Sequence, residues 1–249
     1  LGSAISISCP NIMLNTIAAE ELRQFADQLE GSADLEGDVR KIVQRVMKEH
    51  KRIIFNGDGY SEAWTQEAKR RGLLNLPTTV DALPRYLDQK NVELFTSHKI
   101  YTEAEMEARY ETILEEYSKT LNIEALTMSE MTRQDILPAV SAYIASLADA
   151  VASKRAVISG LPCAAETSLI QKLSGLLDSA YEKVEALDAL VADGKASEYD
   201  HNTLRVATYY KDKIIPAMNE LRAVVDQMEV DTSAAFWPYP SYGDLMFRV

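Results

Sequence analysis

The sequence predicts an all-α protein: a long antiparallel helix bundle, shorter helices before it, and a short strand at the N-terminus. Apolar residues recur at intervals of three and four through most of the 249 residues, which is the period of a helix. Glycines and prolines fall mainly between these periodic segments, where helices end. Only near the N-terminus does the period change to two, since Ile5 and Ile7 alternate with Ser6 and Ser8. That alternation is typical of a half-buried strand.

The expected strand has no partner in this sequence. Every segment after Asn11 has a helical pattern, and a single strand is not stable by itself. We therefore expect its partners to lie upstream of Leu1, and the chain to be the end of a larger protein.

Short and medium helices are expected up to about residue 120. The first has an apolar side from Leu14 to Leu29 and ends at Gly31-Ser32, and the second runs from Leu35 to Ile53 with His50 on its apolar side. Further helix boundaries are expected from the turn residues 56–59, a Ser61 cap, a closing Gly72, breaks at Pro77 and Pro84, and a Thr79 cap.

Longer helices follow Thr102, which has capping-box spacing with Glu105. Three apolar seams then predict a bundle of antiparallel helices: 137–151, 169–191 after the break at 159–162, and 214–228 after the break at Asp193-Gly194. Leu147 is expected to be buried on the first of these seams. Pro138 and Pro216 lie inside the pattern and are expected either to kink their helices or to mark junctions.

The amino-acid composition limits the expected cellular location and the kinds of partner. The formal net charge is −12, which disfavours nucleic acid and anionic membrane surfaces. The two cysteines, Cys9 and Cys163, have no metal-binding spacing and suit a reducing cytoplasm. We find no signal-peptide pattern and no apolar run near the roughly 20 residues that span a bilayer.

Three groups of residues suggest chemistry, and each has a simpler reading. Glu198 and His201 have a spacing seen in di-iron bundles, but such a site needs a second motif, so a helix cap at Ser197 or Asp200 is favoured. Residues 56–59 could cradle a phosphate, but Asp58 opposes an anion and a turn is favoured. Six glutamates between 103 and 116 are expected to face solvent, with Glu105–Arg109 and Glu115–Lys119 pairs. We therefore assign no catalytic, cofactor-binding or metal-binding residue.

The C-terminal tail, residues 231–249, is unlike the rest of the chain. Its aromatic and aliphatic side chains are too apolar to remain in water. The tail is expected to dock on its own bundle or on another subunit, and both alternatives remain open. The candidate docking residues are Phe236, Trp237, Tyr239, Tyr242, Leu245 and Phe247.

Several blocks of the sequence resemble the C-terminal region of type III glutamine synthetases. The segment from Ser6 to Thr16, with Pro10, Asn11 and Asn15, is similar to the last strand and following helix of their catalytic domain. The tail block from Trp237 to Phe247 is similar to the family's terminal segment. Three blocks between them also match in order: 55–61, 72–76 and 122–128.

The resemblance implies a parent enzyme that ligates ammonia to glutamate through γ-glutamyl phosphate, with ATP and Mg²⁺ or Mn²⁺. The family's catalytic motifs precede this segment, so no catalytic residue carries over, and this chain alone is expected to be inactive. The resemblance also implies a homo-oligomer of two stacked hexameric rings, to which the helical region contributes structure or contacts. The alternative is a freestanding helical module that binds a partner.

The expected division of the chain follows the same resemblance. Residues 1–33 would end a catalytic domain. Residues 34–249 would form a helical C-terminal domain, with shorter helices in 34–120, the bundle in 121–230 and the docked tail in 231–249.

Overall fold

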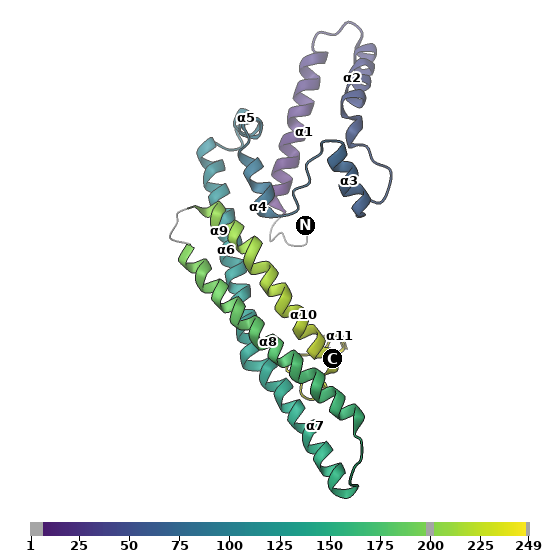
Figure 1. Ribbon diagram of the computed structural model, residues 1–249. Coiled ribbons are helices and arrows are strands. Elements are labelled where there is room, and N and C mark those ends of the chain that lie inside the picture. The colour runs from purple at the N-terminus through teal and green to yellow at the C-terminus, as the bar shows by residue number, and fades with distance from the viewer. Residues whose placement is uncertain (1–6, 198–201, 248–249) are drawn as a thin grey trace. The chain divides into compact units, whose positions relative to one another are not determined.

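The structure is a computed structural model that describes residues 7–197 and 202–247 (Figure 1). The chain divides into two compact units, Leu1–Thr112 and Ile113–Val249. Throughout the described residues the regular structure is helical.

The predicted N-terminal strand is wrong. Helix α1 begins at Ser8 and runs to Leu29, so Ser8 lies in a helix, and Ile7 lies in a bend. Residues 1–6, including Ile5, lie outside the described residues. Pro10 is tolerated within the first turn of α1 because that turn does not use its backbone N–H groups for intrahelical bonds. The alternation of Ile and Ser therefore does not determine the backbone here, and no strand occurs between residues 7 and 197 or between 202 and 247.

The first unit is built from α1 and a series of shorter helices. In chain order these are α2 (Leu35–His50), η1 (Lys51–Ile53), α3 (Glu62–Arg70), α4 (Thr79–Ala82), η2 (Leu83–Leu87), α5 (Gln89–Ser97) and the start of α6 (Glu103–Met131). Its buried core contains Tyr86, Val92, Phe95 and Met106, and Ile12 and Met13 of α1 pack against this core. One side of α1 is thereby fixed to the shorter helices.

The caps of these helices mostly match the predicted ones. The Ser61 side chain accepts a hydrogen bond from the Trp64 N–H at 3.4 Å, and Gly72 has the positive φ of 68° that favours glycine after a helix end. The Thr102 N–H donates to the Glu105 carboxylate at 2.8 Å, as the capping box requires. The predicted Thr79 cap is wrong by one residue, because the Thr78 hydroxyl accepts the capping hydrogen bond of α4.

A polar contact also joins α1 to the end of α5. His98 Nε2 lies 2.7 Å from the Glu20 carboxylate. Hydrogen bonds from Arg23, Gln24 and His98 stabilise the ionised carboxylate and hold the pKa of Glu20 well below its usual range. The contact reinforces the packing of α1 on the shorter helices.

The second unit is a bundle of three long helical segments. In the first, α6 continues through η3 (Thr132–Ile136) into α7 (Leu137–Val157). Helix α8 (Ala164–Ser197) returns beside it, and α9 (Thr203–Tyr209), η5 (Tyr210–Ile214) and α10 (Ile215–Asp231) form the third segment (Figure 1). Residues from all three segments form one apolar core, among them Val140, Leu187 and Leu221. The predicted antiparallel bundle is thus present.

Both prolines of the bundle mark junctions. Pro138 and Pro216 are each the second residue of an α-helix that follows a π-helical turn, in η3 and η5. An interior proline removes one backbone hydrogen bond and its ring clashes with the preceding turn. A π turn holds one extra residue and changes the hydrogen-bond register locally, so the helix passes the proline without ending.

The predicted break at Asp193-Gly194 is wrong, because α8 continues through both residues to Ser197. Gly194 has a packing role: a Cβ built on it would lie 3.1 Å from the Tyr209 ring. The Tyr209 hydroxyl donates to the Leu190 carbonyl at 2.9 Å. Glycine at this position therefore lets an aromatic side chain approach α8 closely.

Leu147 was predicted to be buried, but the structure shows it half-buried against the edge of the core. It lies toward the α7–α8 end of the bundle, where Val157 and Ile158 are exposed. The expectation that no apolar run approaches a membrane-spanning length is wrong for the continuous segment Glu103–Val157. An 18-residue window in it has a mean hydropathy of 1.5, so one described helix is long and apolar enough to cross a membrane by length and composition. The alanine-rich α7 packs on α8, as a bundle helix does.

We expect Leu187→Ala to destabilise the second unit by about 2 to 5 kcal/mol, because it leaves a cavity in a fully buried part of the core. Leu147→Ala is the matched control and should have a clearly smaller effect, since that side chain is half-buried. Urea denaturation followed by circular dichroism measures both. Equal losses for the two variants would contradict the described position of the core.

Candidate functional site

The candidate docking residues of the tail follow directly after α10. The Thr232 hydroxyl is buried and donates to the Met228 carbonyl at 2.7 Å, which fixes the end of the helix. The Phe236 and Trp237 N–H groups both bond to the Ser233 carbonyl, at 2.8 and 3.0 Å. This turn reverses the chain and directs the aromatic side chains back toward the bundle.

The first half of the tail packs on its own bundle. The ring centroids of Phe236 and Tyr143 are 5.3 Å apart, and Trp237 and Tyr239 both pack against the apolar core. The Tyr239 hydroxyl donates to the Asp135 carboxylate at 2.8 Å. Burial of the phenol, together with this hydrogen bond, raises the pKa of Tyr239 to about 12. In the structure these three residues thus dock on their own bundle, which is the first of the two alternatives left open by the sequence.

The second half of the tail is a short helix, α11 (Tyr242–Phe247), whose apolar side chains are not covered. Tyr242, Leu245 and Phe247 are 84%, 65% and 79% exposed, and Met246 is exposed as well. Ser241 and Asp244 cap the helix through reciprocal hydrogen bonds. The Ser241 hydroxyl and N–H both donate to the Asp244 carboxylate and lower its pKa. The six candidate residues therefore divide into a docked group (Phe236, Trp237, Tyr239) and an uncovered group (Tyr242, Leu245, Phe247).

The docked tail depends on the η3 turn, which a cluster of polar side chains fixes to α8. Arg133 donates to Asp188 at 2.6 Å and to Glu185 at 2.5 Å, and the Ser129 hydroxyl donates to Asp188 at 2.6 Å. The two carboxylates raise the pKa of Arg133. Asp135 lies in the same turn, so this cluster holds the residue that receives the Tyr239 hydrogen bond.

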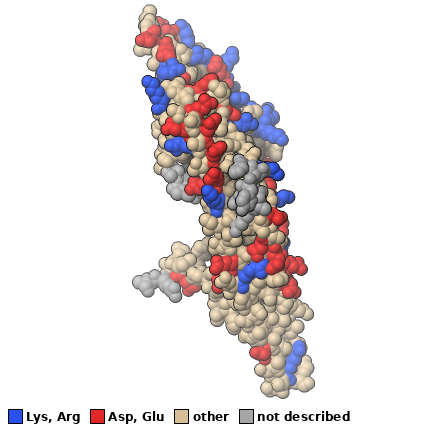
Figure 2. All heavy atoms as spheres, turned by 90° about the vertical axis from the view of Figure 1, so that its left-hand side faces the viewer, with Lys and Arg blue, Asp and Glu red and all other residues tan. Residues whose placement is uncertain are grey.

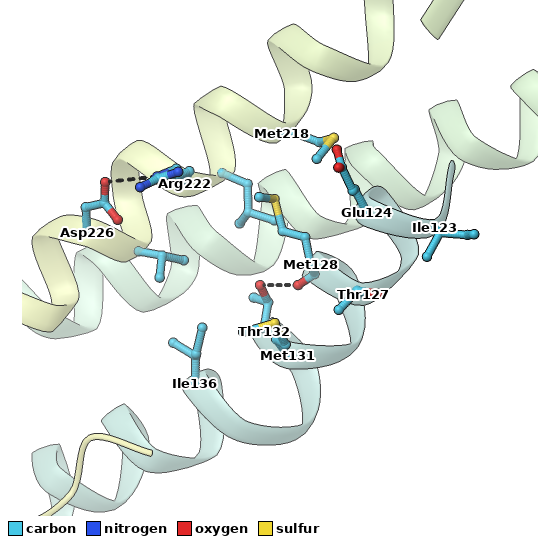
Figure 3. Close-up of a pocket in the computed structure, with 12 residues that line it drawn as sticks. Ile123, Glu124, Thr127, Met128, Met131, Thr132, Ile136, Met218, Arg222 and Asp226 are labelled. Carbon is cyan, nitrogen blue, oxygen red and sulfur yellow. Dashed lines mark hydrogen bonds and ion pairs between the residues drawn. The ribbon is translucent and has the colours of Figure 1, made fainter. Parts of the chain in front are cut away.

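A methionine-rich groove lies between α6–η3 and α10 (Figure 3). Its volume is about 470 Å³, and its apolar lining includes Met128, Met131, Met218, Leu221 and Val225. The Thr132 hydroxyl in the groove already donates to the Met128 carbonyl at 2.8 Å (Figure 3). Arg222 and Asp226, which also line it, form an ion pair at 3.5 Å. The groove therefore offers chiefly apolar contacts.

The structure also shows where the other residues considered from the sequence lie and what they contact. His50 is exposed at the end of α2 rather than at the edge of the core. The segment 56–59 leads into the turn before α3, in which the Ser61 N–H donates to the Asp58 carbonyl and the Asp58 carboxylate accepts the Tyr60 N–H at 2.9 Å. Glu198 and His201 lie outside the described residues. The Glu115–Lys119 pair forms at 2.9 Å, whereas the Arg109 guanidinium lies over the Tyr101 ring.

Charge is mixed over the part of the surface that Figure 2 presents, where acidic and basic side chains lie close together. Among residues 7–197 and 202–247, no three His, Cys, Asp or Glu side chains are grouped so that they could hold a metal ion.

Sequence reasoning missed the contact residues Asp135 and Arg133 and the groove. Asp135 stands three residues before Pro138, and the proline is the only local sign of the π turn that presents it. The groove could not be found because it joins residues about 90 positions apart in the chain.

Comparisons with known proteins agree with the resemblance. Residues 38–155 match the family described as glutamine synthetase C-terminal domain. The chain is 36% identical over 87% of its length to a glutamine synthetase of Butyrivibrio fibrisolvens, covering 30% of that protein. It is 32% identical over 99% of its length to a type-3 glutamine synthetase of Dictyostelium discoideum, covering 34% of that protein. A glutamine synthetase of Bacteroides fragilis is 27% identical over 99% of the chain. The chain thus spans about a third of the length of these curated relatives.

We expect the docking of the tail to weaken as the pH rises from 10 to 12. Below the ordinary Tyr pKa of 10.0, Tyr239 keeps its proton whether docked or released; above it, only the docked form, with a pKa of about 12, still holds the proton. The fluorescence of Trp237 in a Trp64→Phe background measures docking. Tyr239→Phe is the control and should not show the loss of docking between pH 10 and 12 that is caused by ionisation of Tyr239. An identical pH profile in both proteins would show that Tyr239 does not cause that loss.

We expect Trp237→Ala to lower the melting temperature of the chain by about 4 to 8 °C, which corresponds to about 2 kcal/mol for a half-buried Trp in a unit of this size. Phe247→Ala should leave the melting temperature of the isolated chain unchanged, because Phe247 is 79% exposed. Differential scanning calorimetry measures both variants. A loss for Phe247→Ala as large as that for Trp237→Ala would show that α11 packs on the bundle.

Proposed function

We propose that the chain is the C-terminal helical part of a glutamine synthetase, because residues 38–155 match the glutamine synthetase C-terminal domain family. The observation that carries the proposal is the family match, together with the similarity to glutamine synthetases along nearly the whole chain. The parent enzyme would join ammonia to glutamate with the energy of ATP.

The chemistry of this reaction belongs to the part of the polypeptide that the relatives have in addition to this segment. Phosphorylation of the γ-carboxylate of glutamate needs ATP and a divalent cation such as Mg²⁺ or Mn²⁺, held by clustered oxygen ligands. The charged clusters described above are engaged in other contacts: Arg133 with Asp188, for example, fixes η3 to α8. We therefore propose a structural role for this chain.

We propose that α11 contributes to contacts between subunits of a homo-oligomer. The docked residues Trp237 and Tyr239 hold the preceding segment against the bundle, so α11 projects from a fixed position. Four of the six residues of α11 have exposed apolar side chains. Three of these are aromatic residues or Met, which are enriched in the buried centres of protein interfaces. A short helix with such a composition suits insertion into an apolar surface of a neighbouring subunit.

The full-length protein tests the activity. We expect it to release phosphate from ATP in the presence of Mg²⁺ only when both glutamate and ammonia are supplied, and to form glutamine in equal amount. The isolated 249-residue chain should form none and should give no micromolar ATP binding by calorimetry. A full-length protein that forms no glutamine would contradict the proposed activity, and tight ATP binding by the isolated chain would contradict the structural role.

The double variant Leu245→Ser/Phe247→Ser tests the assembly role in the full-length protein. We expect it to reduce the molar mass measured by light scattering after size exclusion, because the contact loses its apolar side chains. Val157→Ser is the matched control, since Val157 is 84% exposed at the end of α7 and belongs to no proposed contact. An unchanged oligomer in the double variant would refute the role of α11.

A further inference from the structure

Another uncovered apolar surface lies in the first unit, between α1 and α2. The groove between these two helices has a volume of about 350 Å³, and apolar side chains line it throughout. Phe25 and Leu29 line it from α1, and Val39, Val43 and Met47 line it from α2. We call this surface, together with Leu22 on the same apolar seam of α1, the α1–α2 groove.

The groove is open although its composition is that of a protein interior. Helix α2 has no buried residue, and its Val39, Val43 and Met47, spaced by four residues, are 41%, 54% and 54% exposed. On α1, Leu22 is 67% exposed. A row of large apolar side chains on two adjacent helices is not usual for a surface that remains in water.

The opposite side of α1 packs on the core of the first unit. Helix α1 is therefore firmly attached, and the exposure of its other side is not caused by loose packing. Thr16 is 4% exposed, and Ile12 and Met13 pack on the core of the unit. Glu20 forms its hydrogen bond with His98 farther along. These contacts fix α1 in an orientation that leaves the groove uncovered within the described part of the first unit.

The lengths of the relatives suggest an occupant for the groove. The relatives are about three times as long as this chain, and two of them align over 99% of it, including α1 and α2. The C-terminal domain family nevertheless matches only from residue 38, so α1 lies outside the matched domain. A helix shared with the longer relatives but lying outside this domain suits a position between the domain and the additional polypeptide.

The chemistry of the groove agrees with a permanent contact. Its lining has no charged side chain, whereas Lys41, Arg45, Lys48 and Glu49 line a separate surface of α2. Interfaces that persist resemble a core divided in two, and charged residues are depleted from their centres. A transient partner or an anionic surface would instead engage the basic residues.

We propose that the α1–α2 groove is the docking surface for the remaining polypeptide of the full-length protein, whose apolar side chains fill it. The inference rests on the proposed function, because it requires the longer polypeptide that the relatives have. It goes beyond that function by assigning the intramolecular contact to one side of α1 and α2.

Thiol labelling tests the inference. Leu22→Cys and Met47→Cys are made separately in a Cys9→Ser background, where the remaining Cys163 is buried. We expect a maleimide to label both positions at least about tenfold more slowly in the full-length protein than in the isolated chain. Leu74→Cys is the matched control, because Leu74 is 70% exposed and outside the groove, and its labelling rate should be the same in both proteins.

The outcomes separate this inference from the proposed function. Equal labelling of Leu22→Cys in both proteins would overturn the inference even if the full-length protein makes glutamine. Slow labelling of the isolated chain that becomes faster on dilution would show that a second copy covers the groove, which also overturns it. Protection at both groove positions in a full-length protein that makes no glutamine would support the docking surface and contradict the activity.

Discussion

The bundle depends on how two long helices accommodate an interior proline. At Pro138 and at Pro216 a regular α-helix would lose a hydrogen bond and meet a steric clash, and in both cases a π turn precedes the proline. The two junctions share the order Ile, an aliphatic residue, Pro and Ala, at 136–139 and 214–217. Both helical segments therefore continue along α8 instead of ending halfway, and the bundle keeps its full length.

The π turn at η3 also creates the contacts on which the tail depends. The turn carries Arg133 and Asp135, and the two side chains have different partners: Arg133 pairs with Asp188 of α8, and Asp135 accepts the hydrogen bond of Tyr239. An isolated exposed ion pair contributes little to stability, but here Arg133 bonds to both Glu185 and Asp188, and Asp188 also accepts a hydrogen bond from Ser129. The π turn that accommodates Pro138 thus also provides the contacts on which the C-terminal tail docks.

The two uncovered apolar surfaces for which a partner is proposed differ in geometry. Helix α11 is a short projecting segment with large side chains, whereas the α1–α2 groove is an open concave surface between two longer helices. The first suits insertion into another subunit and the second suits coverage by a folded part of the same polypeptide. Under the two proposals above, another subunit would cover α11 and the remaining polypeptide would cover the α1–α2 groove.

The sequence alone was enough to predict the helices and most of their caps, because helical periodicity and capping are local properties. Ser61, Gly72 and the Thr102–Glu105 box could be recognised within a few residues, and the resemblance to a family could be recognised from short blocks. The same local reasoning failed where a distant contact decides the conformation. Gly194 reads as a helix end but instead makes room for Tyr209, and the alternation at Ile7 and Ser8 reads as a strand although Ser8 begins a helix.

The tail shows the same division most clearly. Its sequence determined that aromatic residues at 236–247 must find apolar surroundings, because leaving them in water is unfavourable. Which of them dock could not be read from the sequence, since docking requires Asp135 and Tyr143, about 100 residues earlier, to lie beside Tyr239 and Phe236. Only the packing of the long helices on α8 creates that proximity, and it leaves α11 beyond the reach of the core.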